Sequence, residues 1–142
     1  MEVGGLVIRL QDYRELPSVF RLTVFCNPPQ EMIDKSISVN HALSVNLLQL
    51  TPFRRTMQLE TCFVDLLSQM PEMPIIRDID VLFNPAYQVD VMQLLVSAYK
   101  RKPFRLIWPG SFDNGKLVYS EKQYSDYKAF DANAYDILCV KD

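Results

Sequence analysis

The stretch from Pro74 to Gly110 reads PIIRDIDVLFNPAYQVDVMQLLVSAYKRKPFRLIWPG, and it decides the fold. It begins with an apolar strand, turns at Asn84-Pro85, and continues as a helix from about Gln88 to Arg101. A second apolar strand, Phe104–Trp108, follows and ends at Pro109-Gly110. Strand, helix and strand in this order form the repeating unit of an α/β sheet.

The flanking segments continue the same alternation. Further strands are predicted at Phe20–Cys26, Ile37–Val39, Leu117–Tyr119, Tyr127–Phe130 and Asp136–Val140. Further helices are predicted as one turn at Gln30–Asp34, at Ala42–Leu50 with Asn40 as N-cap, and from Pro52 to about Gln69 with Thr51 as N-cap. Together, these elements predict an α/β three-layer sandwich with a mainly parallel central sheet, in one domain spanning residues 1–142.

Two regions fit this alternation less well. Residues 1–19 could form a strand or a helix, and we favour a helix or a peripheral arm that ends at Pro17. The Asp113-Asn114-Gly115 signature predicts a turn within a small irregular excursion before the final strand.

Composition excludes several classes of protein. Hydrophobic residues make up 49% of the 142 residues, enough for a core, and the net charge of -2 gives no electrostatic case for nucleic acid or an anionic membrane. No apolar run approaches the roughly 18 residues of a membrane span. The N-terminus has acids and no basic n-region, so we expect a cytoplasmic protein.

The sequence contains three cysteines and one histidine. Cys26, Cys62 and Cys139 lie far apart among apolar neighbours and form no CxxC pair, so neither a zinc site nor a disulfide framework is expected. A nucleophilic role for a cysteine, or a general-base role for His41, would need partners in space. We favour inert core thiols and a local hydrogen bond at a helix start, and we assign no catalytic residue.

Two acids near the end of a strand, Asp78 and Asp80, suggest a nucleotide site, because α/β folds often hold a metal–phosphate group there. The matching phosphate loop, G-x-x-x-x-G-K-[ST], should follow Phe20–Cys26. Asn27 stands in place of its first glycine, and the nearest Lys-Ser pair, Lys35-Ser36, is shifted by two residues.

No glycine occurs between Gly5 and Gly110, so the phosphate loop is degenerate. The candidate nucleotide-binding remnant consists of Asn27, Lys35, Ser36, Asp78 and Asp80. The alternative for the two acids is a solvated strand end or an ion pair with Arg77.

Basic and aromatic clusters offer two further surfaces. Phosphates of DNA could contact Arg54, Arg55, Lys100, Arg101 and Lys102, although the helix macrodipole also explains the last three. A protein interface or a lid over the core could use Trp108, Phe112, Tyr119, Tyr124 and Tyr127.

The runs DIDVLFNPAYQVDVMQLLVSAYKRK, FRLIWPG and LVYSEKQYSDYKAF, with VNHALSVNLLQL before them, resemble BrxF, the small P-loop-like protein of type 3 bacteriophage exclusion (BREX) systems. The resemblance covers roughly residues 37–140. Its most telling pieces are Leu82-Phe83 with Pro85, the Trp108-Pro109-Gly110 stop, and the Tyr119–Tyr127 segment.

That resemblance implies a P-loop-NTPase-like fold and a role in phage defence, in a complex with a DNA methyltransferase and larger ATPases. The family's Gly-Lys-Thr loop is missing here, so ATP hydrolysis is not carried over.

Three hypotheses follow from these observations. The first is a non-catalytic interaction subunit with no cofactor, acting through protein partners, with DNA contact and oligomerisation left open. The second is an ATP-binding protein that uses Mg²⁺, an atypical loop at residues 27–36, Asp78 and Asp80. The third is a DNA-binding accessory protein.

Overall fold

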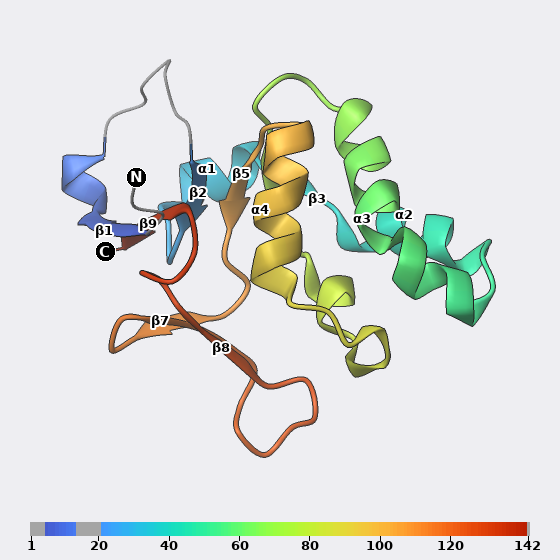
Figure 1. The fold of residues 1–142 in the computed structure, drawn as a ribbon. Helices are drawn as coiled ribbons and strands as arrows, with labels where there is room; N and C mark the ends of the chain where they lie inside the picture. The colour runs from blue at the N-terminus through green and yellow to red at the C-terminus, as the bar shows by residue number, and fades with distance from the viewer. Residues whose placement is uncertain (1–4, 14–20, 142) are drawn as a thin grey trace.

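The computed structural model describes residues 5–13 and 21–141, and its centre is a six-stranded sheet (Figure 1). Every strand pair in this sheet is parallel, and the spatial order is β1-β9-β2-β5-β4-β3. The strands are β1 (Leu6–Arg9), β2 (Leu22–Phe25), β3 (Ile37–Ser38), β4 (Ile75–Arg77), β5 (Arg105–Ile107) and β9 (Ile137–Lys141). The prediction of a mainly parallel central sheet is confirmed.

Helices connect these strands, as the alternation of the sequence predicts. They are α1 (Gln30–Lys35), α2 (Asn40–Leu48), α3 (Pro52–Ser68) and α4 (Val91–Arg101). Three short 3-10 helices lie at Leu10–Asp12, Asp80–Phe83 and Pro85–Tyr87. Parallel strands with helical crossovers form an α/β architecture that is compatible with a three-layer sandwich.

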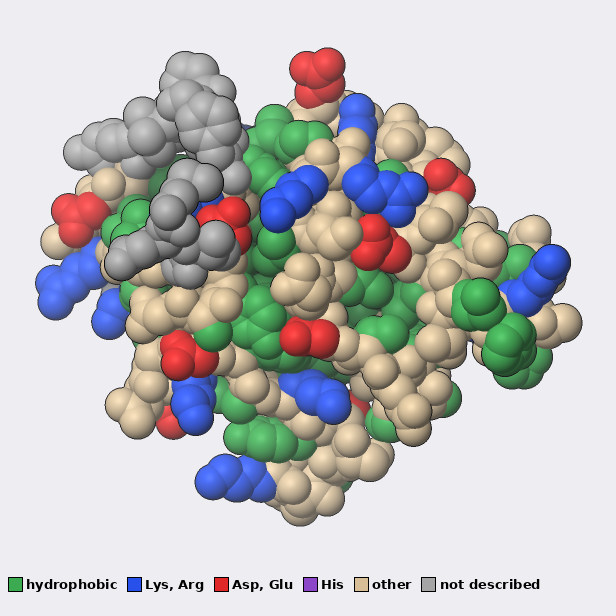
Figure 2. All heavy atoms as spheres, viewed as in Figure 1, with side chains coloured by type: hydrophobic (Ala, Val, Ile, Leu, Met, Phe, Trp, Pro, Cys, Tyr) green, Lys and Arg blue, Asp and Glu red, His purple; other side chains and the backbone are tan. Residues whose placement is uncertain are grey.

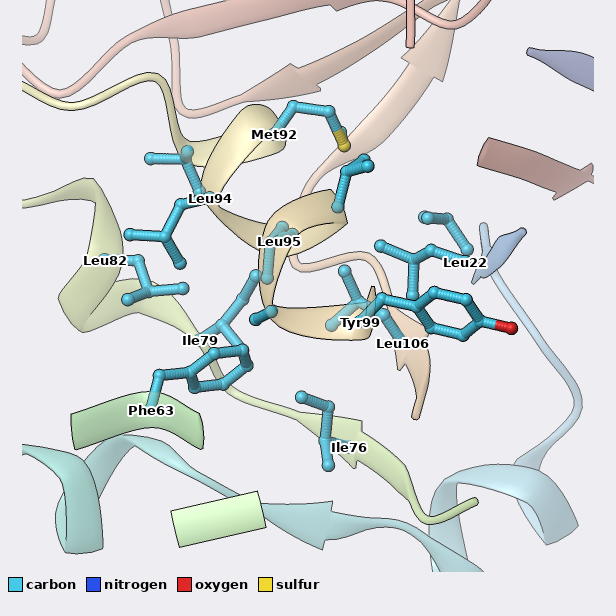
Figure 3. Close-up of a cluster of buried hydrophobic side chains, with 14 of the residues drawn as sticks. Leu22, Phe63, Ile76, Ile79, Leu82, Met92, Leu94, Leu95, Tyr99 and Leu106 are labelled. Carbon is cyan, nitrogen blue, oxygen red and sulfur yellow. The ribbon is translucent and has the colours of Figure 1, made fainter. Parts of the chain in front are cut away.

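The core lies between the sheet and helices α3 and α4. The apolar stripe of α3 buries Leu59 and Phe63, and α4 buries Leu95. They belong to one buried cluster with Ile76 and Leu106 of the sheet (Figure 3). This burial explains why the 3.6-residue periodicity identified α3 from sequence.

Local signals fix most helix starts, with one exception. Thr51 caps α3 as predicted, and the Asp90 carboxylate caps α4 by accepting a hydrogen bond from the Gln93 amide at 3.1 Å. The helix predicted from Gln88 therefore begins at Val91 instead.

Asn40 is not the N-cap that the sequence predicted. It is the first residue of α2, and its side-chain oxygen accepts a hydrogen bond from the Val81 amide at 2.7 Å. Asn40 thus fastens the start of α2 to the segment that follows β4.

The segment after β5 forms a second sheet. The strands predicted at Leu117–Tyr119 and Tyr127–Phe130 belong to it, and the region around Gly115, predicted as an irregular excursion, is ordered as well. Strands β6 (Ser111–Asp113), β7 (Lys116–Tyr119) and β8 (Lys128–Asp131) are antiparallel. Asn114 and Gly115 both have positive φ, 51° and 79°, as a two-residue hairpin turn requires. The excursion is an ordered β-hairpin because Asn-Gly satisfies that turn and β8 then pairs with β7.

The helix favoured for the N-terminus is wrong over residues 6–9, where the strand alternative holds. This segment is β1, an edge strand whose Leu6 pairs with Leu138 of β9. Its β conformation depends on a partner from the opposite end of the sequence. The remainder of the predicted arm, residues 1–4 and 14–19 with Pro17, lies outside the described residues.

Candidate functional site

A cavity of about 770 Å³ opens at the carboxyl edge of the parallel sheet. All strands of this sheet point the same way, so the segments after β2, β4, β5 and β9 meet at this edge. Cys26-Asn27-Pro28, Arg77-Asp78, Trp108-Pro109-Gly110 and Lys141 line the cavity, together with Ile33, Ile107, Ser111 and Phe112. Open α/β sheets bind their ligands at this edge.

The connection after β2 also ends at this edge, where the sequence analysis looked for a phosphate loop. Asn27 adopts a left-handed conformation with φ of 54°, and α1 begins directly after Pro28-Pro29. Lys35 is the last residue of α1, and the Ser36 hydroxyl donates a hydrogen bond back to the Ile33 carbonyl. Of the loop remnant, Asn27 lines the cavity, whereas Lys35 and Ser36 lie at the far end of α1.

Asp78 holds the end of β4 to its neighbour β3. Its carboxylate accepts a hydrogen bond from the Ser38 hydroxyl at 2.6 Å and forms an ion pair with Arg77. The ion pair agrees with one of the two alternatives drawn from the sequence. The side chain is 44% exposed, which places this pair in partly solvated surroundings.

Asp80 faces the second sheet instead. Its carboxylate accepts a hydrogen bond from the Tyr119 hydroxyl at 2.8 Å. Burial, together with this bond to Asp80, raises the pKa of Tyr119 above its ordinary value. The two acids therefore belong to different hydrogen-bonded units.

A second, more polar cavity of about 580 Å³ lies beside the first and shares Asp78 with it. It is lined by Ser38, Asn40, His41, Ser44, Asp78 and Asp80. His41, the single histidine, is exposed at the start of α2. Within residues 5–13 and 21–141, no three His, Cys, Asp or Glu side chains gather in a group that could hold a metal ion.

The predicted interface aromatics occupy different environments. Trp108 is 4% exposed and donates from Nε1 to the Val118 carbonyl at 3.0 Å. Tyr119 stacks on Phe83 with ring centroids 3.7 Å apart, and Phe112 lines the larger cavity. Tyr127 is half-buried, and Tyr124 is 58% exposed.

The five basic residues proposed for DNA lie in two places. Arg54 and Arg55 are at the start of α3, and the other three are at the end of α4, which is well separated from the start of α3 (Figure 1). The Arg55 Nε donates to the Leu47 and Leu50 carbonyls at 3.0 and 3.1 Å. Arg101 pairs with Glu60 at 3.2 Å. DNA contact through these residues, with Lys100 and Lys102, stays a prediction.

Sequence reasoning missed an exposed hydrophobic surface on α2 and α3. We define the α2–α3 patch as Val45, Leu48, Phe53 and Met57, which are 43%, 68%, 76% and 69% exposed. Figure 2 shows hydrophobic side chains gathered at this end of the molecule beside a basic side chain. Phe53 and Met57 lie one helical turn apart, off the buried stripe of α3, which is the sequence signal that could have identified them.

No helix in the described ranges combines the length and apolar character that crossing a bilayer requires. Comparison of the chain with protein-family models, curated proteins and solved structures gives no match.

Proposed function

We propose that this protein is a non-hydrolytic, P-loop-like interaction subunit that binds an acidic amphipathic segment of a partner protein through the α2–α3 patch. The resemblance to BrxF suggests that the partner belongs to a phage-defence complex containing a DNA methyltransferase and a large ATPase. The observation that carries the proposal is the exposure of the four apolar side chains of the patch.

The large exposed apolar side chains of the α2–α3 patch favour binding of a partner protein. They form a group on two packed helices, and contiguous apolar patches on a protein surface mark interaction sites. A single exposed leucine would need no explanation, whereas Leu48, Phe53 and Met57 together do.

The charge around the patch selects the kind of partner. Arg54 is exposed beside Phe53, and the sequence from Lys35 to Leu59 contains no aspartate or glutamate. A helix that carries acidic residues beside its apolar face would match both features, since complementary charges steer association and fix register.

The hydrogen bonds and the ion pair that Asp78 and Asp80 form within the protein support a role without ATP hydrolysis. Asp78 is engaged by Ser38 and Arg77, and Asp80 is engaged by Tyr119, so both carboxylates hold parts of the fold together. The P-loop-like scaffold is supported by the position of these acids after β4, with β5 separating β4 from β2.

Replacing Phe53 and Met57 with serine should weaken binding to the partner at least tenfold, about 1.4 kcal/mol, because buried aromatic anchors dominate interfaces. The measurement is titration calorimetry with the methyltransferase and the large ATPase that the resemblance implies as partners. Arg54→Glu should weaken binding further and remove part of the salt dependence of the association rate.

Tyr124→Ser provides the matched control, since it also removes an exposed aromatic ring but lies outside the patch. Equal affinities for the wild type and the double variant would contradict the proposal. A concentration-dependent dimer abolished by the same double variant would identify a second copy of this chain as the occupant instead.

ATP binding is the second candidate, and the larger cavity favours it. Arg77 and Lys141 place two cationic side chains at this cavity, beside Asp78. Titration with ATP and Mg²⁺ should then give heat in the wild type and less in Asp78→Ala and Lys141→Ala. No heat in the wild type would eliminate this candidate.

A further inference from the structure

Two cysteines that are distant in sequence meet inside the sheet. The sulfur atoms of Cys26 and Cys139 lie 3.6 Å apart, although 113 positions separate the residues. Cys139 belongs to β9, and Cys26 directly follows β2, the strand beside it. The sequence predicted isolated, inert thiols, and the topology makes them neighbours.

The pair is within reach of solvent through one member. Cys26 lines the larger cavity at the carboxyl edge of the sheet, whereas Cys139 is fully buried behind it. Lys141 lines the same cavity and lies two residues from Cys139. A small neutral oxidant that enters this cavity therefore meets Cys26 first.

A hydrogen bond couples the Cys26 and Cys139 thiols. Their mutual hydrogen bond lowers the pKa of Cys139 and raises that of Cys26, because a thiolate formed in the pair is stabilised by the proton of the remaining thiol. The pair thus titrates as a unit in which Cys139 is the more acidic thiol, and the hydrogen bond between the two sulfur atoms gives the Cys26 proton a path to the Cys139 thiolate.

We propose that Cys26 and Cys139 form a redox-sensitive thiol pair that hydrogen peroxide converts to a disulfide between β2 and β9. The Cys26 sulfur attacks one peroxide oxygen as its proton passes to the Cys139 thiolate, the O–O bond breaks, and hydroxide leaves, giving a sulfenic acid at Cys26 and a thiol at Cys139. Cys139 then attacks the Cys26 sulfur and forms the S–S bond, and its proton and the sulfenic hydroxyl leave as water. In sum, two thiols and one peroxide give one disulfide and two waters.

Bond formation requires both the sulfur atoms and the backbone at Cys26 to move, because Cys139 is in register with Val24, two residues before Cys26. The sulfur atoms must approach from 3.6 Å to about 2.05 Å. Cys26 lies beyond the last residue of β2, and Asn27 after it has positive φ, so the backbone at this point is outside the regular strand. The disulfide would join the strand that leads into α1 to the final strand of the sheet.

The test is peroxide treatment of the purified full chain, followed by thiol counting, intact mass and peptide mapping. The expected result is loss of two of the three thiols and of two hydrogens in mass, reversed by dithiothreitol. Mapping should recover the Cys26 and Cys139 peptides as one cross-linked species. Wild-type protein suffices, so the result does not depend on whether a variant folds.

Variants separate this pair from Cys62, the remaining free cysteine, which lies half-buried on α3. Cys62→Ser should retain the full two-thiol loss. Cys139→Ser should stop at a Cys26 sulfenic acid that dimedone traps. Uniform oxidation of all three thiols, or a wild-type Cys26 that proceeds to sulfinic acid without the cross-link, would overturn the proposal.

Discussion

Gly110 shows how one residue joins the two sheets. It lies between β5 and β6, and its backbone passes so close to β7 that a Cβ atom would sit 1.9 Å from the Val118 carbonyl oxygen. The same carbonyl accepts the hydrogen bond from the Trp108 indole. A side chain at position 110 would therefore push the two sheets apart at the mouth of the larger cavity.

Gly110→Ala should lower the free energy of unfolding by about 1–3 kcal/mol, the usual cost of forcing extra volume into a packed site. Urea denaturation followed by circular dichroism measures it. Gly115→Asn is the matched control, because no atom lies within 4 Å of a Cβ there and asparagine tolerates its positive φ. Equal losses for both variants would show that the contact with Val118 is not decisive.

Residues whose partners are close in sequence were the predictable ones. The Thr51 cap and the Asn84-Pro85 turn depend on the next few residues, so the sequence identified both. The partner of Asp78 is Ser38, 40 positions away, and no local pattern reports such a contact. For the same reason the Cys26–Cys139 contact was not foreseen.

At the scale of elements, an aromatic cluster fastens the antiparallel sheet to the α/β core. Phe83 of the segment after β4 stacks on Tyr119 of β7 and meets Trp108 edge-on at 5.8 Å. Phe130 of β8 meets both Trp108 and Phe83, with ring centroids 6.0 and 6.5 Å away, so the three rings form one cluster. The Tyr119 hydroxyl also donates a hydrogen bond to Asp80. The ring and the hydroxyl of Tyr119 therefore both hold the antiparallel sheet to the α/β core.

Tyr119→Phe keeps the ring and removes the hydrogen bond, so we expect a loss of about 1 kcal/mol at neutral pH. The raised pKa of Tyr119 also fixes the pH dependence. The contribution of the neutral hydroxyl is complete below the unfolded-state pKa of about 10 and is lost as pH rises above it.

Wild-type stability should consequently fall more steeply than that of Tyr119→Phe between pH 9 and the alkaline limit of folding, as urea midpoints at several pH values will report. Parallel curves for the two proteins would show that Tyr119 does not control the alkaline transition.

Among the elements, the long periodic helix was the easiest to predict. The 17 residues of α3 contain several turns of a periodic stripe, which is ample for recognition. Strands β6 and β1 were missed although β3 and β5 are no longer than they are, and both missed strands take their conformation from pairing with a partner strand.

At the scale of the whole molecule, strand order was the feature furthest from prediction. Alternating strands and helices imply a parallel sheet, but not that β9 lies between β1 and β2. The exposure of the α2–α3 patch is likewise a property of the assembled fold, because only the packing of α2 on α3 decides which apolar residues remain outside.

The place of β9 also determines the order in which the molecule can be assembled. Strands β2, β5, β4 and β3 are contiguous in the sheet and can pair as soon as residue 107 has left the ribosome. Among the described strands, β1 precedes the others in the sequence, yet it has no neighbour until residues 137–141 take their place beside β2. Until β9 has been synthesised, the backbone of β1 therefore needs water or a chaperone as its hydrogen-bonding partner.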